Sequence, residues 1–238
     1  MTVQMEFNTW ISFVLYAVTG RMAQADSVMK EFGPFIRRQA KRQAEEQPVE
    51  SKPLYRGILL DDGRPVSQHD SADVGGGVLM VGMSPPGGSM IGADGCVPHA
   101  LDAMTFVSHT EDLECAKWFA SPDTVMGSFV ATLHPGARGY IVRLEKPTTR
   151  VLWHHSWMDV RMPDGRGRIP LVSACLQHPE LRQYADQFQW NARTQNETII
   201  EPGPERLKIE EVDDLDVKAL DKRFCHPSFL GQQEREDG

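Results

Sequence analysis

Residues 105–120 read TFVSHTEDLECAKWFA, a β-rich apolar run that changes directly into a helical pattern. The composition of residues 105–110 is typical of a short strand, and residues 111–120 continue as a helix. Thr110 is a residue type that caps helices, and the acidic residues after it complement the helix dipole. We therefore expect a strand-to-helix boundary with Thr110 as the N-cap.

A second apolar run, LYRGILL at residues 54–60, indicates a buried strand. It carries Arg56 in its middle, and an arginine in a buried strand needs a partner for its charge. The same reasoning predicts further strands at residues 126–133, 139–145, 149–154, 197–200 and 207–212, and a helix at residues 181–190.

Residues 8–46 predict two helices, with Asn8 or Thr9 capping the first and Gly20 near its end. The Gly33-Pro34 step is expected to break or kink the second helix. The basic residues of that helix have two interpretations: a phosphate site, or, more commonly, a solvated helix face. They are Arg37, Arg38, Lys41 and Arg42.

The composition of the 238 residues is that of an ordinary globular protein, with 40% hydrophobic and 24% charged residues. The formal net charge of -8 gives no general attraction to phosphate backbones, so the sequence does not favour a nucleic-acid partner. The four cysteines form no C-x-x-C pair, which fits a reducing, cytoplasmic compartment. The most apolar stretch, residues 10–18, is too short to span a membrane.

The remaining motifs point to no metal and no known phosphate loop. His154 and His155 are adjacent rather than four residues apart on a helix, and no Cys/His cluster has zinc spacing, so we expect no metal. The Gly/Pro/Ser-rich stretch 61–98 lacks a Walker or dinucleotide spacing, and a flexible flap is its commoner interpretation. Neither Cys115 nor Cys175 has an evident base that would make it a nucleophile.

Three separated polar elements lie on or beside apolar strands: Arg56, Ser108 with Thr110, and Gln195 with Glu197. Each alone has a structural explanation, such as a core ion pair or a strand end. In this order they resemble the arginine, serine and glutamate signature of the toxin-like ADP-ribosyltransferases, in the Gln-x-Glu variant found in bacterial effectors and phage-encoded enzymes. The resemblance covers residues 53–212.

The resemblance implies an α+β fold in which two packed β-sheets form an NAD cleft flanked by helices. It implies that NAD is the co-substrate and that Glu197 stabilises the positive charge that develops on the ribose. Ser108 would hydrogen-bond either Glu197, keeping its carboxylate oriented, or the ribose on the nicotinamide side. Gln195 would contact the incoming nucleophile, as expected if it shares a strand face with Glu197. The residues expected to bind NAD are Arg56, Tyr55, Gly57, Ser108, His109, Thr110 and Phe119.

The sequence departs from the family in three places, one of which is the larger distance between the aromatic residue Trp190 and Gln195. His109 stands where the family commonly has threonine, and residues 156–190 form a longer segment than expected between the second and third motifs. These differences leave the target open, and the presence of Gln195 in place of glutamate implies that arginine is disfavoured as the acceptor.

We therefore expect an N-terminal helical extension at residues 1–50, a catalytic domain at 51–216 and an acidic tail at 217–238. The expected activity is mono-ADP-ribosylation of a macromolecule, with protein favoured over nucleic acid and no membrane contact. Two alternatives stay open: an NAD glycohydrolase, and an interaction or inhibitor protein that retains the fold without its chemistry.

Overall fold

The structure is a computed structural model in which the chain divides into two compact units. The first unit comprises Met1–Lys52, Thr105–Ser108 and Lys146–Pro202, and the second comprises Pro53–Met104, His109–Glu145 and Gly203–Gly238. These units do not follow the boundaries predicted at residues 50 and 216, because the chain crosses between units several times. The residues described are 3–50, 52–61, 64–66, 91–99, 105–124, 134–145, 150–163, 165, 167–177, 179, 182–212 and 215–227.

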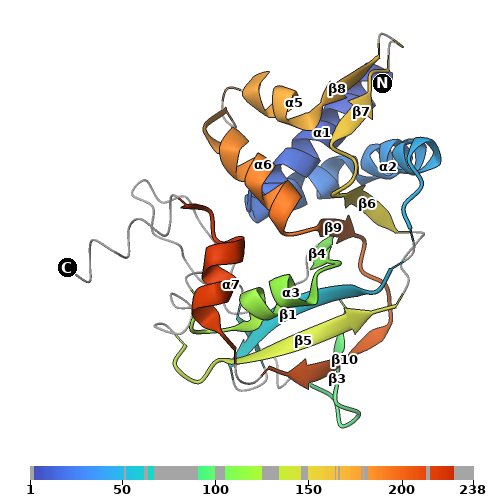
Figure 1. Cartoon of the computed structure of the whole chain (residues 1–238). Helices are drawn as coiled ribbons and strands as arrows, with labels where there is room; N and C mark the ends of the chain where they lie inside the picture. The colour runs from blue at the N-terminus through green and yellow to red at the C-terminus, as the bar shows by residue number, and fades with distance from the viewer. Residues whose placement is uncertain are drawn as a thin grey trace. The chain divides into compact units, whose positions relative to one another are not determined.

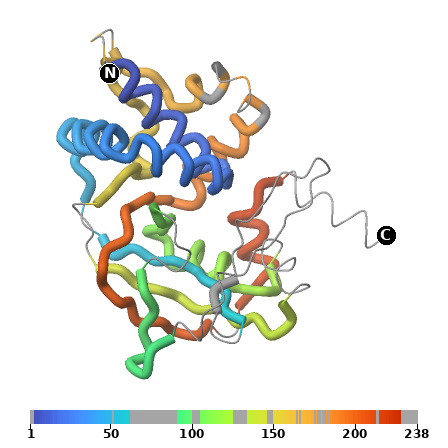
Figure 2. The backbone as a smooth tube through the Cα atoms, turned by 180° about the vertical axis from the view of Figure 1, so that it is seen from behind, coloured from blue at the N-terminus to red at the C-terminus, as the bar shows by residue number. Residues whose placement is uncertain are grey.

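Two N-terminal helices, α1 (Val3–Val18) and α2 (Met22–Glu46), lie side by side in the first unit and are the blue tubes of Figure 2. The predicted cap at Asn8 or Thr9 is wrong, since both residues lie inside α1, where the Thr9 hydroxyl donates to the Met5 carbonyl (2.8 Å). The kink predicted in the second helix is confirmed: Phe32 has non-helical dihedral angles (φ -121°, ψ 16°) just before the Gly33-Pro34 step. Proline disturbs the preceding turn because it has no N–H and crowds the carbonyl four residues back.

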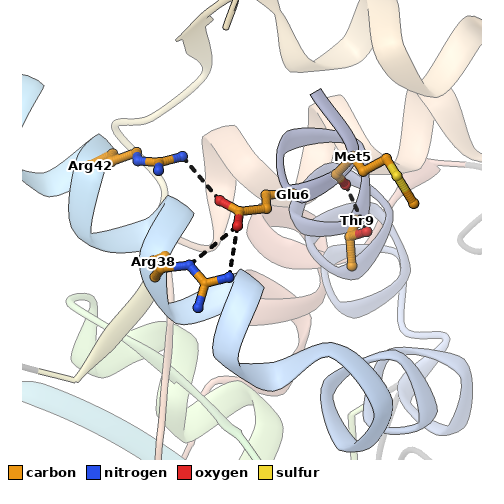
Figure 3. A network of polar contacts seen from close by, with 5 residues as sticks. All are labelled: Met5, Glu6, Thr9, Arg38 and Arg42. Carbon is orange, nitrogen blue, oxygen red and sulfur yellow. Dashed lines mark hydrogen bonds and ion pairs between the residues drawn. The ribbon is translucent and has the colours of Figure 1, made fainter. Parts of the chain in front are cut away.

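Glu6 of α1, itself buried, joins the two helices through ion pairs with two arginines of α2 (Figure 3). Arg38 donates to Glu6 Oε1 (2.7 Å from Nη2) and Arg42 donates to Oε2 (3.1 Å). The Arg38 hydrogen bond is the main reason that the pKa of Glu6 lies below its usual value. A third arginine of the helix, Arg37, pairs with Glu201 (2.6 Å). The basic residues that allowed a phosphate site are therefore largely engaged within this unit.

Replacing Glu6 by Gln is expected to lower the free energy of unfolding by about 1 kcal/mol at pH 7, because the arginine partners are half exposed to water. Since the folded pKa lies below the reference value of 4.5, the stabilisation is present above that pH and is lost as the pH falls through the folded pKa. Urea unfolding at pH 7 and at pH 3 measures the difference, with Glu31→Gln on the exposed face of α2 as the control. An equal loss at both pH values would contradict the electrostatic origin.

The rest of the first unit combines short strands with small helices. Strand β9 (Glu197–Ile200) lies between β4 (Val107–Thr110), which contributes Val107 and Ser108 to this unit, and β6 (Val151–His154). Trp10 of α1 is fully buried and donates to the Leu152 carbonyl (2.9 Å), which fixes the helices to this strand layer. The other elements are β7 (Asp159–Arg161), β8 (Arg168–Pro170), α5 (Leu171–Gln177), η1 (Arg182–Tyr184) and α6 (Ala185–Thr194).

The second unit is built on antiparallel strands in the order β3-β10-β5-β1-β4, with β2 paired to β1. Its longest ladder pairs β1 with β5, from Leu54 opposite Leu144 to Leu60 opposite Arg138. The strands of this unit are β1 (Leu54–Asp61), β2 (Arg64–Val66), β3 (Cys96–Pro98), β5 (Arg138–Leu144), β10 (Arg206–Glu211) and the last residues of β4.

Helix α3 (Leu113–Ala120) crosses β1 and β5 in this unit (Figure 1). Two glycines make the close approach possible: a Cβ at Gly57 would lie 2.0 Å from the Ala116 carbonyl oxygen, and one at Gly139 would lie 1.9 Å from that of Ala120. Real Cβ atoms do not approach an oxygen so closely, so the sequence needs glycine at both positions.

Helix α7 (Val217–Phe224) packs on α3, so the predicted tail at residues 217–238 is wrong for its first part. Leu220 and Phe224 are the buried apolar residues of α7. The indole of Trp118 on α3 donates to Asp221 of α7 (2.8 Å). Apolar burial explains why a segment rich in charge still folds against the unit. The shared cluster contains Cys115, Trp118, Leu220, Phe224 and Cys225.

The mixed α+β class predicted from the sequence is confirmed, with the strand pairs whose register is described all antiparallel. Strands predicted at 54–60, 139–145, 149–154, 197–200 and 207–212 are present with small shifts at their ends, whereas the one predicted at 126–133 and most of the predicted flap lie outside the described residues. The face-to-face arrangement of two sheets stays a prediction. Among the described residues, no helix has the length and apolar character that a membrane span requires.

Candidate functional site

The side chains of Ser108 and Glu197 are hydrogen-bonded to each other in the first unit. Glu197 is the first residue of β9, a strand whose residues are all buried, and its own exposed fraction is 8%. The Ser108 hydroxyl, on β4, donates a hydrogen bond to Glu197 Oε1. The fold therefore joins two polar residues that lie 89 positions apart in the sequence.

Burial changes the acid–base behaviour of Glu197. Loss of hydration raises the pKa of the Glu197 carboxyl to about 7, and the hydrogen bond from Ser108 acts in the opposite direction by stabilising the carboxylate. Near neutral pH the group therefore exists in both its ionised and its neutral form. Buried carboxyl groups with a shifted pKa are characteristic of functional sites, although structural networks produce them as well.

Replacing Ser108 by Ala is expected to raise the pKa of Glu197 further, because the change removes a hydrogen bond that lowers it. The pKa is measured from the side-chain carboxyl signal of Glu197 by NMR or by infrared difference spectroscopy across pH 5 to 9. Ser27→Ala, at an exposed position of α2, serves as the control and is expected to leave the titration unchanged. An unchanged or lowered pKa in the Ser108 variant would contradict the assignment.

Gln195 lies at the end of α6 rather than in a strand. The expectation that it shares a strand face with Glu197 is therefore wrong. It is the C-cap residue of the helix with αR dihedral angles, and β9 begins only at Glu197. Between them Asn196 has a positive φ of 46°, a conformation that ends many helices and that asparagine tolerates. The alternation of strand faces therefore does not relate Gln195 to Glu197. Gln195 is nevertheless buried, and its Nε2 donates to Asn191 Oδ1 (3.2 Å).

The three residues of β1 that were expected to bind NAD belong to the second unit. Two of them have packing roles in this unit. Gly57 faces the backbone of α3, and Tyr55 packs against an apolar cluster that includes Ala116 of that helix. Successive residues of a strand point to opposite faces, so Arg56 projects from the other face of β1. Arg56 is half-buried there.

His109 and Thr110, at the end of β4, are buried in the second unit. His109 packs edge-on against His99, with the ring centroids 5.2 Å apart. Thr110 pairs with Tyr55 across the two strands, and its hydroxyl accepts from the Asp112 backbone N–H (2.9 Å).

Thr110 is not the cap of α3, which corrects the prediction. The N-cap is Asp112, whose carboxylate accepts from the backbone N–H groups of Glu114 (2.9 Å) and Cys115 (3.4 Å). Phe119, on the same helix, is partly buried against the cluster shared with α7 and contacts the ring of Trp118 (4.8 Å between centroids).

Sequence reasoning missed two residues beside the Glu197 strand. Asn191 accepts a hydrogen bond from Gln195 and donates one to the Val18 carbonyl (3.0 Å). Its contact with Gln195 could have been predicted from the sequence, because residues four positions apart on a helix are neighbours. His155 donates its backbone N–H to the Glu197 carbonyl (2.9 Å), and its neighbour His154 is opposite Thr198 in the β6–β9 ladder. Only the fold could reveal this second contact.

The first unit thus holds a buried carboxyl group, a hydroxyl that orients it and a fixed amide. Comparison of the chain with models of protein families, with curated proteins and with solved structures finds no match. The candidate residues divide between the units as follows: Ser108, Gln195 and Glu197 in the first, and Arg56, Tyr55, Gly57, His109, Thr110 and Phe119 in the second.

Proposed function

We propose that this chain is a mono-ADP-ribosyltransferase that moves ADP-ribose from NAD to a macromolecular acceptor, with the fold of that family. The observation that supports the proposal most directly is the hydrogen bond from Ser108 to the buried Glu197. The resemblance implies that Ser108 hydrogen-bonds either Glu197 or the ribose of NAD, and the observed hydrogen bond fits the first of these roles. If Ser108 and Glu197 each had only a structural role in its own strand, the two side chains would have no reason to be in contact.

Glu197 is the residue proposed to promote cleavage of NAD. The bond between ribose C1′ and the nicotinamide nitrogen breaks, and its electron pair leaves with neutral nicotinamide. A lone pair of the acceptor forms the new bond to C1′, and the acceptor's proton passes to water. Positive charge develops on the ribose, as in glycoside hydrolysis, and an ionised Glu197 in a site with little water stabilises it.

Ser108 and Arg56 have supporting roles in this proposal. Ser108 holds the Glu197 carboxylate in one orientation and favours its ionised form. Arg56 supplies a forked guanidinium suited to the diphosphate of NAD, since arginine binds phosphate oxygens with paired N–H groups. Tyr55 and Gly57 then act through packing beneath that residue rather than by contacting NAD.

The acceptor is proposed to be a protein. The net charge of -8 gives the chain no general attraction to nucleic acid, which must otherwise be bound through a local patch. The arginines of α2 do not supply that patch, because Arg37, Arg38 and Arg42 are paired with glutamates.

The experiment is incubation of the protein with NAD labelled in its adenylate part and a bacterial lysate, followed by separate protease and nuclease treatment. Label transferred by the wild type and not by Glu197→Gln, and released by protease, is the expected result. A matched control is Glu201→Gln, which makes the same chemical change four residues later and removes an ion pair with the half-exposed Arg37.

The other outcomes separate the alternatives. Sensitivity to nuclease alone would assign the acceptor to nucleic acid, and release of nicotinamide without labelled product would assign the protein to the NAD glycohydrolases. No turnover of NAD with or without lysate would contradict the proposal and favour an interaction protein.

A further inference from the structure

Asp26 of α2 holds the start of the segment that carries Ser108. Its Oδ1 atom accepts two hydrogen bonds from Thr105, one from the backbone N–H (2.9 Å) and one from the hydroxyl (2.8 Å). Its Oδ2 atom pairs with Lys30, one helical turn later (2.5 Å). Asp26 is itself buried, so both oxygens of a buried carboxylate have fixed partners within the first unit.

These contacts keep Asp26 ionised. Burial on its own would raise the pKa of the Asp26 carboxyl, but the hydrogen bonds from Lys30 and Thr105 outweigh it, and the pKa lies below its usual value. A hydrogen bond to an ionised acceptor is stronger than one between neutral groups. The contact of Asp26 with Thr105 is therefore a firm attachment throughout the neutral pH range.

The segment Thr105–Ser108 belongs to the first unit, although the chain on both sides of it belongs to the second. The two N-terminal helices hold it within the first unit. The polar attachment is that of Thr105 to Asp26 of α2, and the apolar one is that of Phe106 to Phe13 of α1. These two buried rings pack edge-on, with their centroids 5.1 Å apart. Both helices lie outside the part of the chain that the resemblance covers.

The position of Thr105 limits where the Ser108 hydroxyl can lie, because only three peptide bonds separate the two residues. An O–H···O hydrogen bond spans about 2.5–3.0 Å, so a displacement of about 1 Å weakens or breaks it. We infer that Asp26 is a positioning residue of the proposed active site: by fixing Thr105, it keeps the Ser108 hydroxyl within reach of Glu197. The inference rests on the proposed transferase function, in which Ser108 orients the Glu197 carboxylate.

Positioning and direct electrostatics predict opposite changes when Asp26 is removed. A nearby negative charge disfavours ionisation of a carboxyl group, so the loss of Asp26 acting through space would lower the pKa of Glu197. The loss of positioning instead withdraws the Ser108 hydrogen bond, which stabilises the Glu197 carboxylate, so the pKa would rise. The direction of the change therefore separates the two effects.

The test is a double-mutant cycle read from the side-chain carboxyl signal of Glu197 by NMR. Asp26→Ala is expected to raise the pKa of Glu197 by about one unit, the size of one hydrogen bond to a charged group. In the Ser108→Ala background it is expected to cause no further rise, because Asp26 acts through Ser108. The signal of Glu197 itself is followed because His154 and His155 lie beside this strand.

Two further variants distinguish positioning from a general effect of the substitution. Asp26→Asn keeps an oxygen for Thr105 and is expected to leave the pKa of Glu197 within a few tenths of the wild-type value. Asp159→Ala makes the same change as Asp26→Ala at an exposed position of β7 and is expected to have no effect. An unchanged or lowered pKa in Asp26→Ala, or an equal rise with and without Ser108, would overturn the inference.

Thermal unfolding of each variant shows whether it is folded at the assay temperature. If Asp26→Ala is not, Thr105→Val takes its place in the cycle. This variant removes one of the two hydrogen bonds to Asp26 and keeps the backbone one, so a smaller rise in the same direction is expected. No rise in Thr105→Val would then overturn the inference.

A rate measurement connects the positioning to the proposed reaction. With a pKa raised from about 7 by one unit, Asp26→Ala is expected to release nicotinamide from NAD roughly fivefold more slowly at pH 7, since fewer Glu197 side chains are ionised. A wild-type rate in this variant, despite a raised pKa, would overturn the catalytic part of the inference. If the wild type cleaves no NAD with or without lysate, the proposed function fails, whereas the titration, which needs no NAD, still decides whether Asp26 positions Ser108.

Discussion

Glu197→Gln is expected to lower the rate of ADP-ribose transfer by at least about 10²–10³-fold, the usual contribution of one preorganised group to transition-state stabilisation. The amide keeps the size of the side chain and a partner for Ser108, but it carries no negative charge to offset that on the ribose. Initial rates of label transfer at saturating NAD measure the effect. A variant that retains more than a tenth of the wild-type rate would remove Glu197 from the mechanism.

The same variant is expected to be more stable than the wild type at pH 8. The folded pKa of about 7 exceeds the reference value of 4.5, so ionisation of the buried carboxyl costs stability as the pH rises through this window. The difference corresponds to about 3 kcal/mol above pH 7 and vanishes below pH 4.5. Urea unfolding at pH 4 and pH 8 gives the two values, and a Glu197→Gln variant that is less stable at pH 8 would contradict the shifted pKa.

Gly57→Ala is expected to destabilise the second unit by about 3 kcal/mol or more, at the upper end of the cost of overpacking a core. The added methyl group would lie 2.0 Å from the Ala116 carbonyl oxygen and 2.6 Å from the Ala120 backbone nitrogen. Both are backbone atoms, so no neighbouring side chain can move to relieve the clash, and α3 must shift away from β1.

The control for this substitution is Gly136→Ala, in an exposed turn of the same unit. Its Cβ would meet only the end of the Asp61 side chain (2.8 Å), which can rotate away. We expect a change below about 1 kcal/mol there, as at most surface positions. If urea unfolding shows similar stability for both variants, α3 does not pack as closely on β1 as the structure describes.

The sequence predicted the strand and helix around residue 110 but chose the wrong cap. Thr110 and Asp112 are both good capping residues, and they lie two positions apart. Composition cannot decide between them, because the choice depends on which side chain reaches the first free N–H groups. The structure assigns the cap to Asp112, and Thr110 instead accepts from the Asp112 N–H.

The Ser108–Glu197 contact was predictable only through the resemblance, because no local pattern relates residues 89 positions apart. The position of Gln195 was predicted for the wrong reason: α6 continues to Thr194, so Gln195 ends a helix and the left-handed Asn196 turns the chain into β9. Polar residues at a helix end and at a strand start look alike in sequence.

The packing roles of Tyr55 and Gly57 also needed the structure. Strand alternation shows that they share a face opposite to Arg56, but it does not show which face a helix covers. Likewise, the grouping of the N-terminal helices with β6 depends on contacts between residues far apart in the sequence, such as that of Trp10 with Leu152.

The most direct test of NAD cleavage through Glu197 is the initial rate of nicotinamide release by the purified protein at pH 8. The wild type and Glu201→Gln are expected to release nicotinamide at similar rates, and Glu197→Gln at a rate at least about 10²-fold lower. Equal rates in all three proteins, or no release by the wild type either alone or with lysate added as the source of acceptor, would contradict the proposed function.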